Sequence, residues 1–302
     1  MKILPSQLTG SVRAIPSKSA AHRAFIAAAL ADGPSSWHLN ASSRDIEATL
    51  DCLIALGAGV VRDNQVVHIA PIADPPAEAI LNCGESGSTL RFMLPVASVL
   101  GTRAAFTGEG RLPERPIADY LSVLEQLGTV CSQKHLPLSV SGKLHGGEVS
   151  LPGNISSQYI TGLLLAAGRL EESLRIRLTT ALESRPYVEL TRVVLSLFDF
   201  PVTETADGFA TPAHTHFSAP RTLTAVEGDW SNAAFFLTAG ALGGPVTVTG
   251  LDSASSQGDR AIADVLRGFG ATVTRRADTV TVSGAPLRAQ TICVREVPDL
   301  FP

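Results

Sequence analysis

The sequence predicts an α/β (α+β) fold built from copies of one βαβαββ element. A Ser-rich polar turn followed by an Ala/Leu-rich segment returns four times, with openings at Ser19, Ser86, Ser156 and Ser231. Successive openings lie 67, 70 and 75 residues apart. A repeat of this length is not a solenoid unit, and it indicates that one supersecondary element has been duplicated. Helices on one side of a mixed sheet then give a layered domain.

Each copy is expected to begin with a helix and a strand. The first helices are predicted at residues 19–31, 88–99, 158–167 and 231–241, and the strands after them at 37–40, 103–107, 174–178 and 246–249. Val, Thr and Ile enrichment supports the last two strands most clearly. The start of a helix has unpaired N–H groups and a partial positive charge. Several such ends aimed at one place would bind anions.

A second helix with a clean apolar periodicity follows in each copy. The apolar stripe falls at Ile46, Leu50, Leu53 and Ile54 in the first copy, and within residues 117–124, 187–195 and 262–269 in the others. One stripe per helix indicates that one face of the helix packs on a sheet. Polar-tipped hairpins are predicted after two of these helices, at residues 60–69 and 272–282.

The copies group into two lobes. Three copies, at residues 15–220, are expected to form one complete lobe. Residues 1–14 are expected to join residues 221–302 in a second lobe. A fifth copy begins near Val297, and the sequence stops at Pro302. A second lobe of matching size would need about two more copies, so we expect this lobe to be incomplete and the chain to be truncated at its C-terminus.

Composition excludes several classes of protein. Of 302 residues, 45% are hydrophobic and 17% are charged, so the chain can bury substantial cores. A net charge of −4 argues against a general nucleic-acid or membrane-surface binder. The four cysteines are scattered and match neither a metal site nor a disulfide framework, which is typical of reduced thiols in a cytoplasmic protein. No signal peptide is evident, and Gly243, Gly244 and Pro245 break the longest apolar stretch.

Residues at the openings of the copies are the candidate anion ligands. Lys18 and Arg23 flank the first opening and could hold phosphate or carboxylate, or simply be solvated side chains of a capped helix. His22 between them is expected to pack or cap. Ser156, Ser157 and Gln158 would make a phosphate cradle or an ordinary helix cap.

The second opening, and the loop that follows the strand of the same copy, contain further candidate anion ligands. Gly84 and Gly87 would let the backbone approach a ligand, or form a tight turn. Arg111 could clamp a second phosphate, whereas Arg115, next to Pro116, is expected to make a structural salt bridge. Taken together, the openings predict a pocket for a multiply phosphorylated small molecule. No serine-hydrolase elbow and no zinc-peptidase motif is present.

Eight stretches along the whole chain resemble shikimate-type members of the enolpyruvyl transferase family. They include PSKSAAHRAFIAAALA, GESGSTLRFM, GEGRLPERPI, SSQYITGLLLAA, ESRPY, EGDWSNAAFFLTAGAL, QGDRAIADVLRGFGA and VPDLFP. The resemblance implies the enolpyruvyl transferase fold, with two lobes of βαβαββ units. It implies transfer of the enolpyruvyl group of phosphoenolpyruvate to the 5-hydroxyl of shikimate 3-phosphate, in chorismate and aromatic amino acid biosynthesis. It also implies a cytoplasmic monomer with these two small-molecule partners, no cofactor and no metal.

Site residues follow from the resemblance position by position. Lys18 and Asp299 would be catalytic, with Lys18 touching both substrates and Asp299 accepting a proton. The implied ligands of shikimate 3-phosphate are Ser19, Arg23, Ser156, Ser157, Gln158, Ser184 and the nearby Tyr187. Gly87 and Arg111 would bind phosphoenolpyruvate, and Gln158 would lie between the two substrates.

Two departures from the family pattern affect these expectations. Glu85 stands where many members have Asn, which would alter the affinity for phosphoenolpyruvate or mark a subgroup. The family's later Lys-Glu motif, later arginines and terminal lysine have no counterpart here. The two substrates carry about −5 to −6 between them, because each has a phosphate and a carboxylate. Lys18, Arg23 and Arg111 supply only three positive charges, so the site is expected to be short of cations.

Two alternatives remain open from the sequence. A chain lacking these groups could bind shikimate 3-phosphate without turnover. The related UDP-N-acetylglucosamine enolpyruvyl transferases are a second alternative. They carry a Cys where this sequence has Gly110, and the Ser-Ser-Gln triplet also favours the shikimate type.

Overall fold

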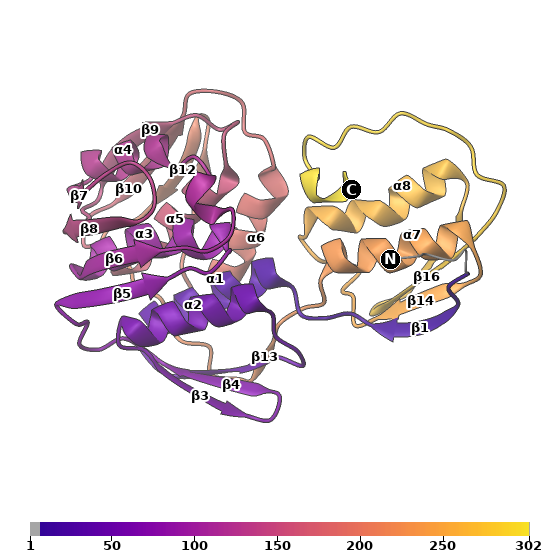
Figure 1. Ribbon diagram of the computed structural model, residues 1–302, viewed down its shortest axis with the longest axis horizontal. Coiled ribbons are helices and arrows are strands. Elements are labelled where there is room, and N and C mark those ends of the chain that lie inside the picture. The colour runs from indigo at the N-terminus through magenta and orange to yellow at the C-terminus, as the bar shows by residue number, and fades with distance from the viewer. Residues whose placement is uncertain (1–6, 302) are drawn as a thin grey trace. The chain divides into compact units, whose positions relative to one another are not determined.

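A computed structural model of the chain describes residues 7–301, which form two compact units (Figure 1). The large unit contains residues 18–226. The small unit contains the N-terminal segment up to residue 17 and the residues from 227 onward. The chain therefore passes between the units twice, once before residue 18 and once after residue 226.

All three sheets of the large unit have the same topology. Their strand orders are β13 (Thr224–Ala225), β2 (Ser35–His38), β4 (Val66–Ala70), β3 (Gly59–Asp63); β5 (Glu78–Asn82), β6 (Arg103–Thr107), β8 (Leu138–Gly142), β7 (Thr129–Cys131); and β9 (Gly147–Leu151), β10 (Leu174–Leu178), β12 (Gly208–Thr211), β11 (Thr203–Thr205). In each sheet the first two strands are parallel and the other neighbours are antiparallel. The predicted duplication of a βαβαββ element is confirmed.

The first helix of each copy is buried on nearly every face. These helices are α1 (Lys18–Leu30), α3 (Gly87–Leu100) and α5 (Ser157–Ala166), which continues into the short helix η2 (Ala167–Arg169). Most of their residues are Ala, Leu or other apolar types, and such helices form the middle of a large core. α5 packs between α3 and the last helix of the unit, and α1 packs on that last helix as well.

The second helix of each copy is amphipathic, as predicted. These helices are α2 (Arg44–Ala55), α4 (Ala118–Gln126), which follows the short helix η1 (Leu112–Glu114), and α6 (Arg185–Ser196). In α2 the stripe residues Ile46, Leu50 and Leu53 are buried, whereas Ile54 is half-exposed. At 3.6 residues per turn, Ile54 points about 80° away from Ile46, so it falls at the edge of the buried stripe.

The small unit repeats the same plan once. Its sheet has the order β1 (Gly10–Arg13), β14 (Val246–Thr249), β16 (Thr279–Ser283), β15 (Thr272–Arg275), with β1 parallel to β14. The helices are α7 (Trp230–Leu242), η3 (Gly258–Ala261), α8 (Ile262–Phe269) and η4 (Pro298–Leu300). The apolar stretch broken by Gly243, Gly244 and Pro245 is thus helix, turn and strand, as predicted.

Three of the four predicted strands lie where they were expected. β6, β10 and β14 occupy the predicted ranges. The prediction for residues 37–40 was wrong by two residues, because β2 begins at Ser35 and ends at His38. Ser35 and Ser36 pair with Ile69 and His68, so the pairing partner rather than local propensity sets this strand.

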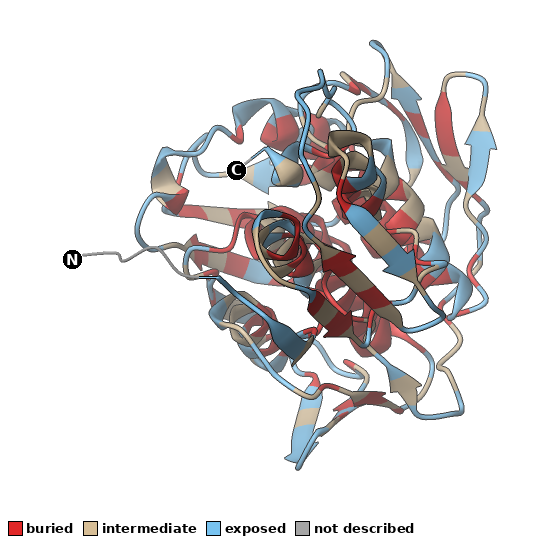
Figure 2. Cartoon of the chain, turned by 90° about the vertical axis from the view of Figure 1, so that its right-hand side faces the viewer, coloured by how far each residue is buried: buried red, intermediate tan, exposed pale blue. Residues whose placement is uncertain are grey.

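Each unit has its own apolar core. The buried residues (red in Figure 2) concentrate on the helices and alternate along the strands. The large-unit cluster includes Phe25, Trp37, Phe92 and Phe198, and the small-unit cluster includes Trp230. Two separate cores are the physical reason why the chain forms two compact units.

Candidate anion site in the large unit

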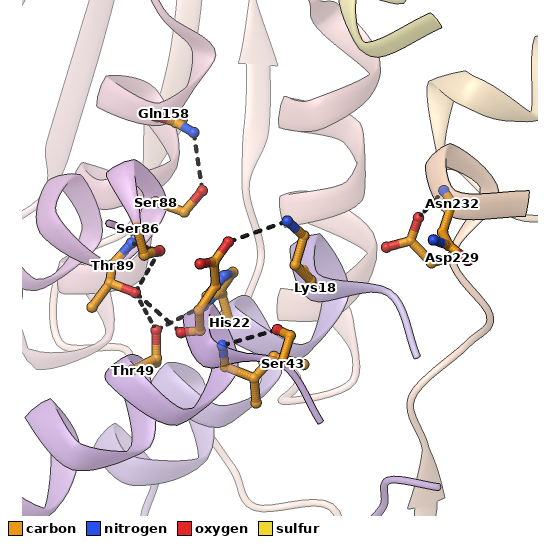
Figure 3. Close-up of polar contacts among 12 residues, drawn as sticks. Lys18, His22, Ser43, Thr49, Ser86, Ser88, Thr89, Gln158, Asp229 and Asn232 are labelled. Carbon is orange, nitrogen blue, oxygen red and sulfur yellow. Dashed lines mark hydrogen bonds and ion pairs between the residues drawn. The ribbon is translucent and has the colours of Figure 1, made fainter. Parts of the chain in front are cut away.

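The helix starts of all three copies of the large unit are joined by polar contacts. Lys18 of α1 pairs with Asp45 of α2, with 3.1 Å between Nζ and Oδ2 (Figure 3). Gln158 of α5 donates from Nε2 to Ser88 Oγ of α3 at 3.0 Å. The backbone carbonyl at the start of α6 accepts from a side chain of α1, Arg23. Three of the four openings predicted from the sequence, those that belong to this unit, are therefore linked to one another.

Three of these helix starts have a serine N-cap. Ser43, Ser86 and Ser156 accept from the backbone N–H of Ile46, Thr89 and Gln158, respectively, at 3.3, 3.1 and 3.2 Å. Ser156 is thus a helix cap, which was one of its two predicted roles. Each cap satisfies one first-turn N–H and leaves the others without an acceptor inside the helix. Those N–H groups and the helix dipole favour an anion at this end.

Lys18 is the exposed cation of the group. Half of its side chain is accessible, and Asp45 is one-third exposed. An ion pair between groups as accessible as these contributes little to stability. The ammonium group can therefore turn to a phosphate or carboxylate at low cost.

Arg23 is a buried guanidinium that has no carboxylate partner among residues 7–301. Nη1 donates to Ser19 O at 2.7 Å, Nη2 to Tyr187 O at 3.1 Å and Nε to Thr191 Oγ1 at 2.8 Å. Burial lowers the pKa of Arg23 to about 9. Nη2 also donates to Thr161 Oγ1 at 3.4 Å. Since all four acceptors are neutral, no carboxylate of the described residues compensates the charge, and an anion bound nearby would be stabilised.

His22 is buried in a chain of hydroxyl groups that links three helices. Its Nδ1 lies 2.7 Å from Thr49 Oγ1, which lies 2.7 Å from Thr89 Oγ1, and Thr89 Oγ1 donates to Ser86 Oγ at 2.8 Å (Figure 3). Burial lowers the pKa of His22 to about 3, so the ring is neutral at physiological pH. This arrangement suits the packing role expected for His22.

The Ser-Ser-Gln triplet and the start of α6 present further polar groups. Ser157 is buried, and Gln158 is fixed between Ser88 and a side chain of α3, Arg91. Ser184 caps α6 in the left-handed conformation, with φ 54°, and its side chain makes no cap hydrogen bond. Non-glycine residues in this uncommon backbone conformation cluster at ligand and active sites.

The structure corrects the role predicted for Arg115. No ion pair is formed by Arg115 among residues 7–301, and its guanidinium lies beside Gly87 instead. Its neighbour Arg111 is highly exposed and pairs with Glu114 at 3.6 Å. The loop that holds both arginines is fixed by Gly110, whose φ is +54° and whose Cα lies against the carboxylate of Glu85.

Asp299 belongs to the small unit and lies exposed on η4. It is close enough to Asp259 for the two carboxylates to interact. Asp259 is buried. Its Oδ2 accepts a hydrogen bond from the hydroxyl of Ser231, and its Oδ1 has no partner among the described residues. Burial raises the pKa of Asp259 to about 6. Asp259 was not predicted as a site residue, although it is the third residue of the family-like stretch QGDRAIADVLRGFGA.

The described residues contain neither a metal-binding cluster nor a membrane-spanning helix. Within 7–301, no three or more His, Cys, Asp or Glu side chains gather in a way that could hold a metal ion. None of the helices in this range combines the length and the apolar character needed to cross a bilayer.

Comparison with known proteins shows which family the chain belongs to. The sequence profile of EPSP synthase (3-phosphoshikimate 1-carboxyvinyltransferase) matches residues 4–302. The 3-phosphoshikimate 1-carboxyvinyltransferase of Methanocorpusculum labreanum is 37% identical, over 98% of this chain and 71% of the relative. The enzymes of that name from Clostridium perfringens and Halobacterium salinarum are each 36% identical over 99% of this chain, which corresponds to 72% and 71% of their lengths.

The fold has solved counterparts. A structure of EPSP synthase from Acinetobacter baumannii superposes with a TM-score of 0.80 at 22% identity, and the match covers 99% of this chain and 71% of that one. The predicted fold class is therefore confirmed.

Proposed function

The chain belongs to the EPSP synthase family, and on that premise we propose that it transfers the enolpyruvyl group of phosphoenolpyruvate to the 5-hydroxyl of shikimate 3-phosphate, with release of phosphate. The family match extends over nearly the whole chain, which favours the transferase over a module that only binds. The two substrates are polyanions, and the helix starts of the large unit suit such ligands.

The single observation that carries the proposal is the convergence of capped helix starts around a buried, uncompensated Arg23. Arg23 donates to acceptors on both α5 and α6. Ser156, Ser157 and Ser184 stand at the starts of these two helices, and Gln158 is already oriented by Ser88. Charge-assisted hydrogen bonds from such donors to a phosphate are stronger than neutral ones. We therefore assign shikimate 3-phosphate to this end of the large unit.

The proposed chemistry needs proton transfers and charge stabilisation but no redox step. The methylene carbon of phosphoenolpyruvate gains a proton and becomes a methyl group, while the 5-hydroxyl attacks the adjacent carbon, which bears the phosphate oxygen. The hydroxyl proton goes to a base and balances the charge of the phosphate released later. Loss of a proton from the methyl group then expels phosphate from the tetrahedral intermediate. Asp299 is the proposed base, and Lys18 stabilises the negative charge that develops on the substrates.

The UDP-N-acetylglucosamine branch is disfavoured by one packing detail. That branch carries a Cys at the position of Gly110. The φ of Gly110 is +54°, which is unfavourable for a residue with a Cβ, and the carboxylate of Glu85 would have to move to make room for a side chain there. Glu85 and Gly110 are thus matched to each other in this chain.

Release of phosphate tests the proposal. The purified chain is incubated with both substrates and with each alone, and inorganic phosphate is measured together with the identity of the organic product. Phosphate release that needs both substrates and yields the enolpyruvyl ether is expected. We expect Lys18→Met to reduce the rate at least tenfold, and the control Lys143→Met, an exposed residue outside this site, to leave it unchanged. Release from phosphoenolpyruvate alone, or none at all, would contradict the assignment.

A further inference from the structure

Two arginine side chains converge on Gly87, the first residue of α3. A Cβ added at Gly87 would lie 2.6 Å from Arg91 Nη1 and 2.7 Å from Arg115 Nη1. Arg91 lies one turn further along α3, and Arg115 lies in the loop that follows η1. Only the absence of a side chain at Gly87 leaves room for both guanidinium groups at the helix N-terminus.

Neither of these positive charges is neutralised within residues 7–301. Arg91 Nη1 donates to Gln158 Oε1 at 3.0 Å and to Gly87 O at 3.4 Å, which are neutral acceptors. Arg91 is nine-tenths buried, and its Nε has no partner. The side chain of Arg115 makes no hydrogen bond and no ion pair in the same residues. The two guanidinium groups and the partial positive charge of the helix N-terminus repel one another, and a bound anion would relieve this repulsion.

The arrangement is held in place by the third copy of the repeat. The Arg91 guanidinium lies 5.9 Å from the centre of the Tyr159 ring, which stacks on Tyr120 at 4.3 Å. Tyr159 also donates from its hydroxyl to Pro116 O at 3.4 Å, next to Arg115. Tyr159 of α5 therefore packs on Arg91 and anchors the backbone next to Arg115, and a preorganised site lowers the entropy cost of binding a ligand.

We propose that Arg91 and Arg115 form a guanidinium clamp that binds one oxyanion group of phosphoenolpyruvate over Gly87. A planar guanidinium on each side of a carboxylate or phosphate can donate two hydrogen bonds to it. The clamp adds two cations to a site for which the sequence indicated only three. The identity of the anion rests on the proposed function, whereas the clamp itself rests on the geometry of Gly87, Arg91 and Arg115.

Calorimetric titration tests the clamp. Phosphoenolpyruvate is titrated into the chain saturated with shikimate 3-phosphate, and inorganic phosphate is titrated into the chain alone. Arg115→Gln is the main variant because this side chain is exposed and its loss should not disturb folding. Arg115→Lys keeps the positive charge but loses the planar guanidinium with its paired N–H donors. Arg103→Gln is the matched control, since Arg103 is an exposed arginine of the same copy whose partner is Glu78.

The expected result is a loss of affinity for phosphoenolpyruvate of about tenfold or more in Arg115→Gln, a smaller loss in Arg115→Lys and none in Arg103→Gln. The affinity for shikimate 3-phosphate should be unchanged in all three. Unchanged phosphoenolpyruvate affinity in Arg115→Gln, or failure of the unaltered chain to bind either oxyanion probe, would overturn the clamp. Oxyanion binding that is sensitive to Arg115 in a chain that does not bind shikimate 3-phosphate would support the clamp and contradict the proposed function instead.

Discussion

His22 illustrates how burial removes a titratable side chain from the chemistry of a nearby site. It stands between Lys18 and Arg23 in the sequence, where a catalytic role is easy to imagine. In the structure its ring is buried against Phe92, at 6.4 Å between centroids, and its Nδ1 is bonded to Thr49. Protonation would place a charge in an apolar core with only neutral partners, so the ring stays neutral.

The buried imidazole predicts acid sensitivity of the large unit. The pKa of His22 is about 3 in the folded chain and near 6.5 when unfolded. The unfolded state therefore binds a proton that the folded state does not, and stability falls as the pH drops from about 6.5 toward 3, by about 4 kcal/mol in all. Amide hydrogen exchange of α1 at several pH values should show this loss in the unaltered chain and a smaller one in His22→Gln.

The exposed His214 provides the control for this experiment. His214→Gln should keep the acid sensitivity of the unaltered chain, because His214 is largely accessible to solvent. Equal slopes of stability against pH in the unaltered chain and in His22→Gln would show that His22 is not the responsible group.

At the scale of elements, periodicity and turn residues predicted the helices and hairpins well. Strand β13 was missed because a two-residue strand has no local signal. The repeat itself held the clue, since the first copy lacked the strand that opens a βαβαββ element. Thr224 and Ala225 supply it by pairing with Trp37 and His38 of β2, far away in the sequence. Tertiary pairing of this kind is not encoded in local propensity.

The hydroxyl chain between α1, α2 and α3 gives a prediction at this scale. Thr49→Val keeps the shape of the side chain but removes its hydroxyl, leaving His22 Nδ1 and Thr89 Oγ1 with fewer partners in a buried place. The expected loss of stability is about 1–3 kcal/mol, measured by urea unfolding. Ser122→Ala on the surface of α4 should change stability by less than about 0.5 kcal/mol. A Thr49→Val chain as stable as the unaltered one would contradict the importance of this link.

For the whole molecule, the sequence indicated a shared anion site but not all of its cations. Lys18, Arg23 and the caps Ser86 and Ser156 were predicted because each stands at a helix opening, whereas the cap Ser43 was not. Arg91 was missed, although side chains on a helix point back toward its N-terminus and a residue four positions after Gly87 covers the first turn. The position of Arg115 beside Gly87 depends on the path of a loop between two elements, which periodicity does not determine.

Calorimetric titration of shikimate 3-phosphate alone shows whether the helix starts of the large unit bind this ligand. We expect one binding site per chain. Affinity should fall about tenfold or more in Ser157→Ala, which loses a hydrogen bond to a charged group, and should be unchanged in Ser196→Ala, where the serine lies exposed near the end of α6. No detectable binding, or equal affinity in the unaltered chain and in Ser157→Ala, would contradict the account.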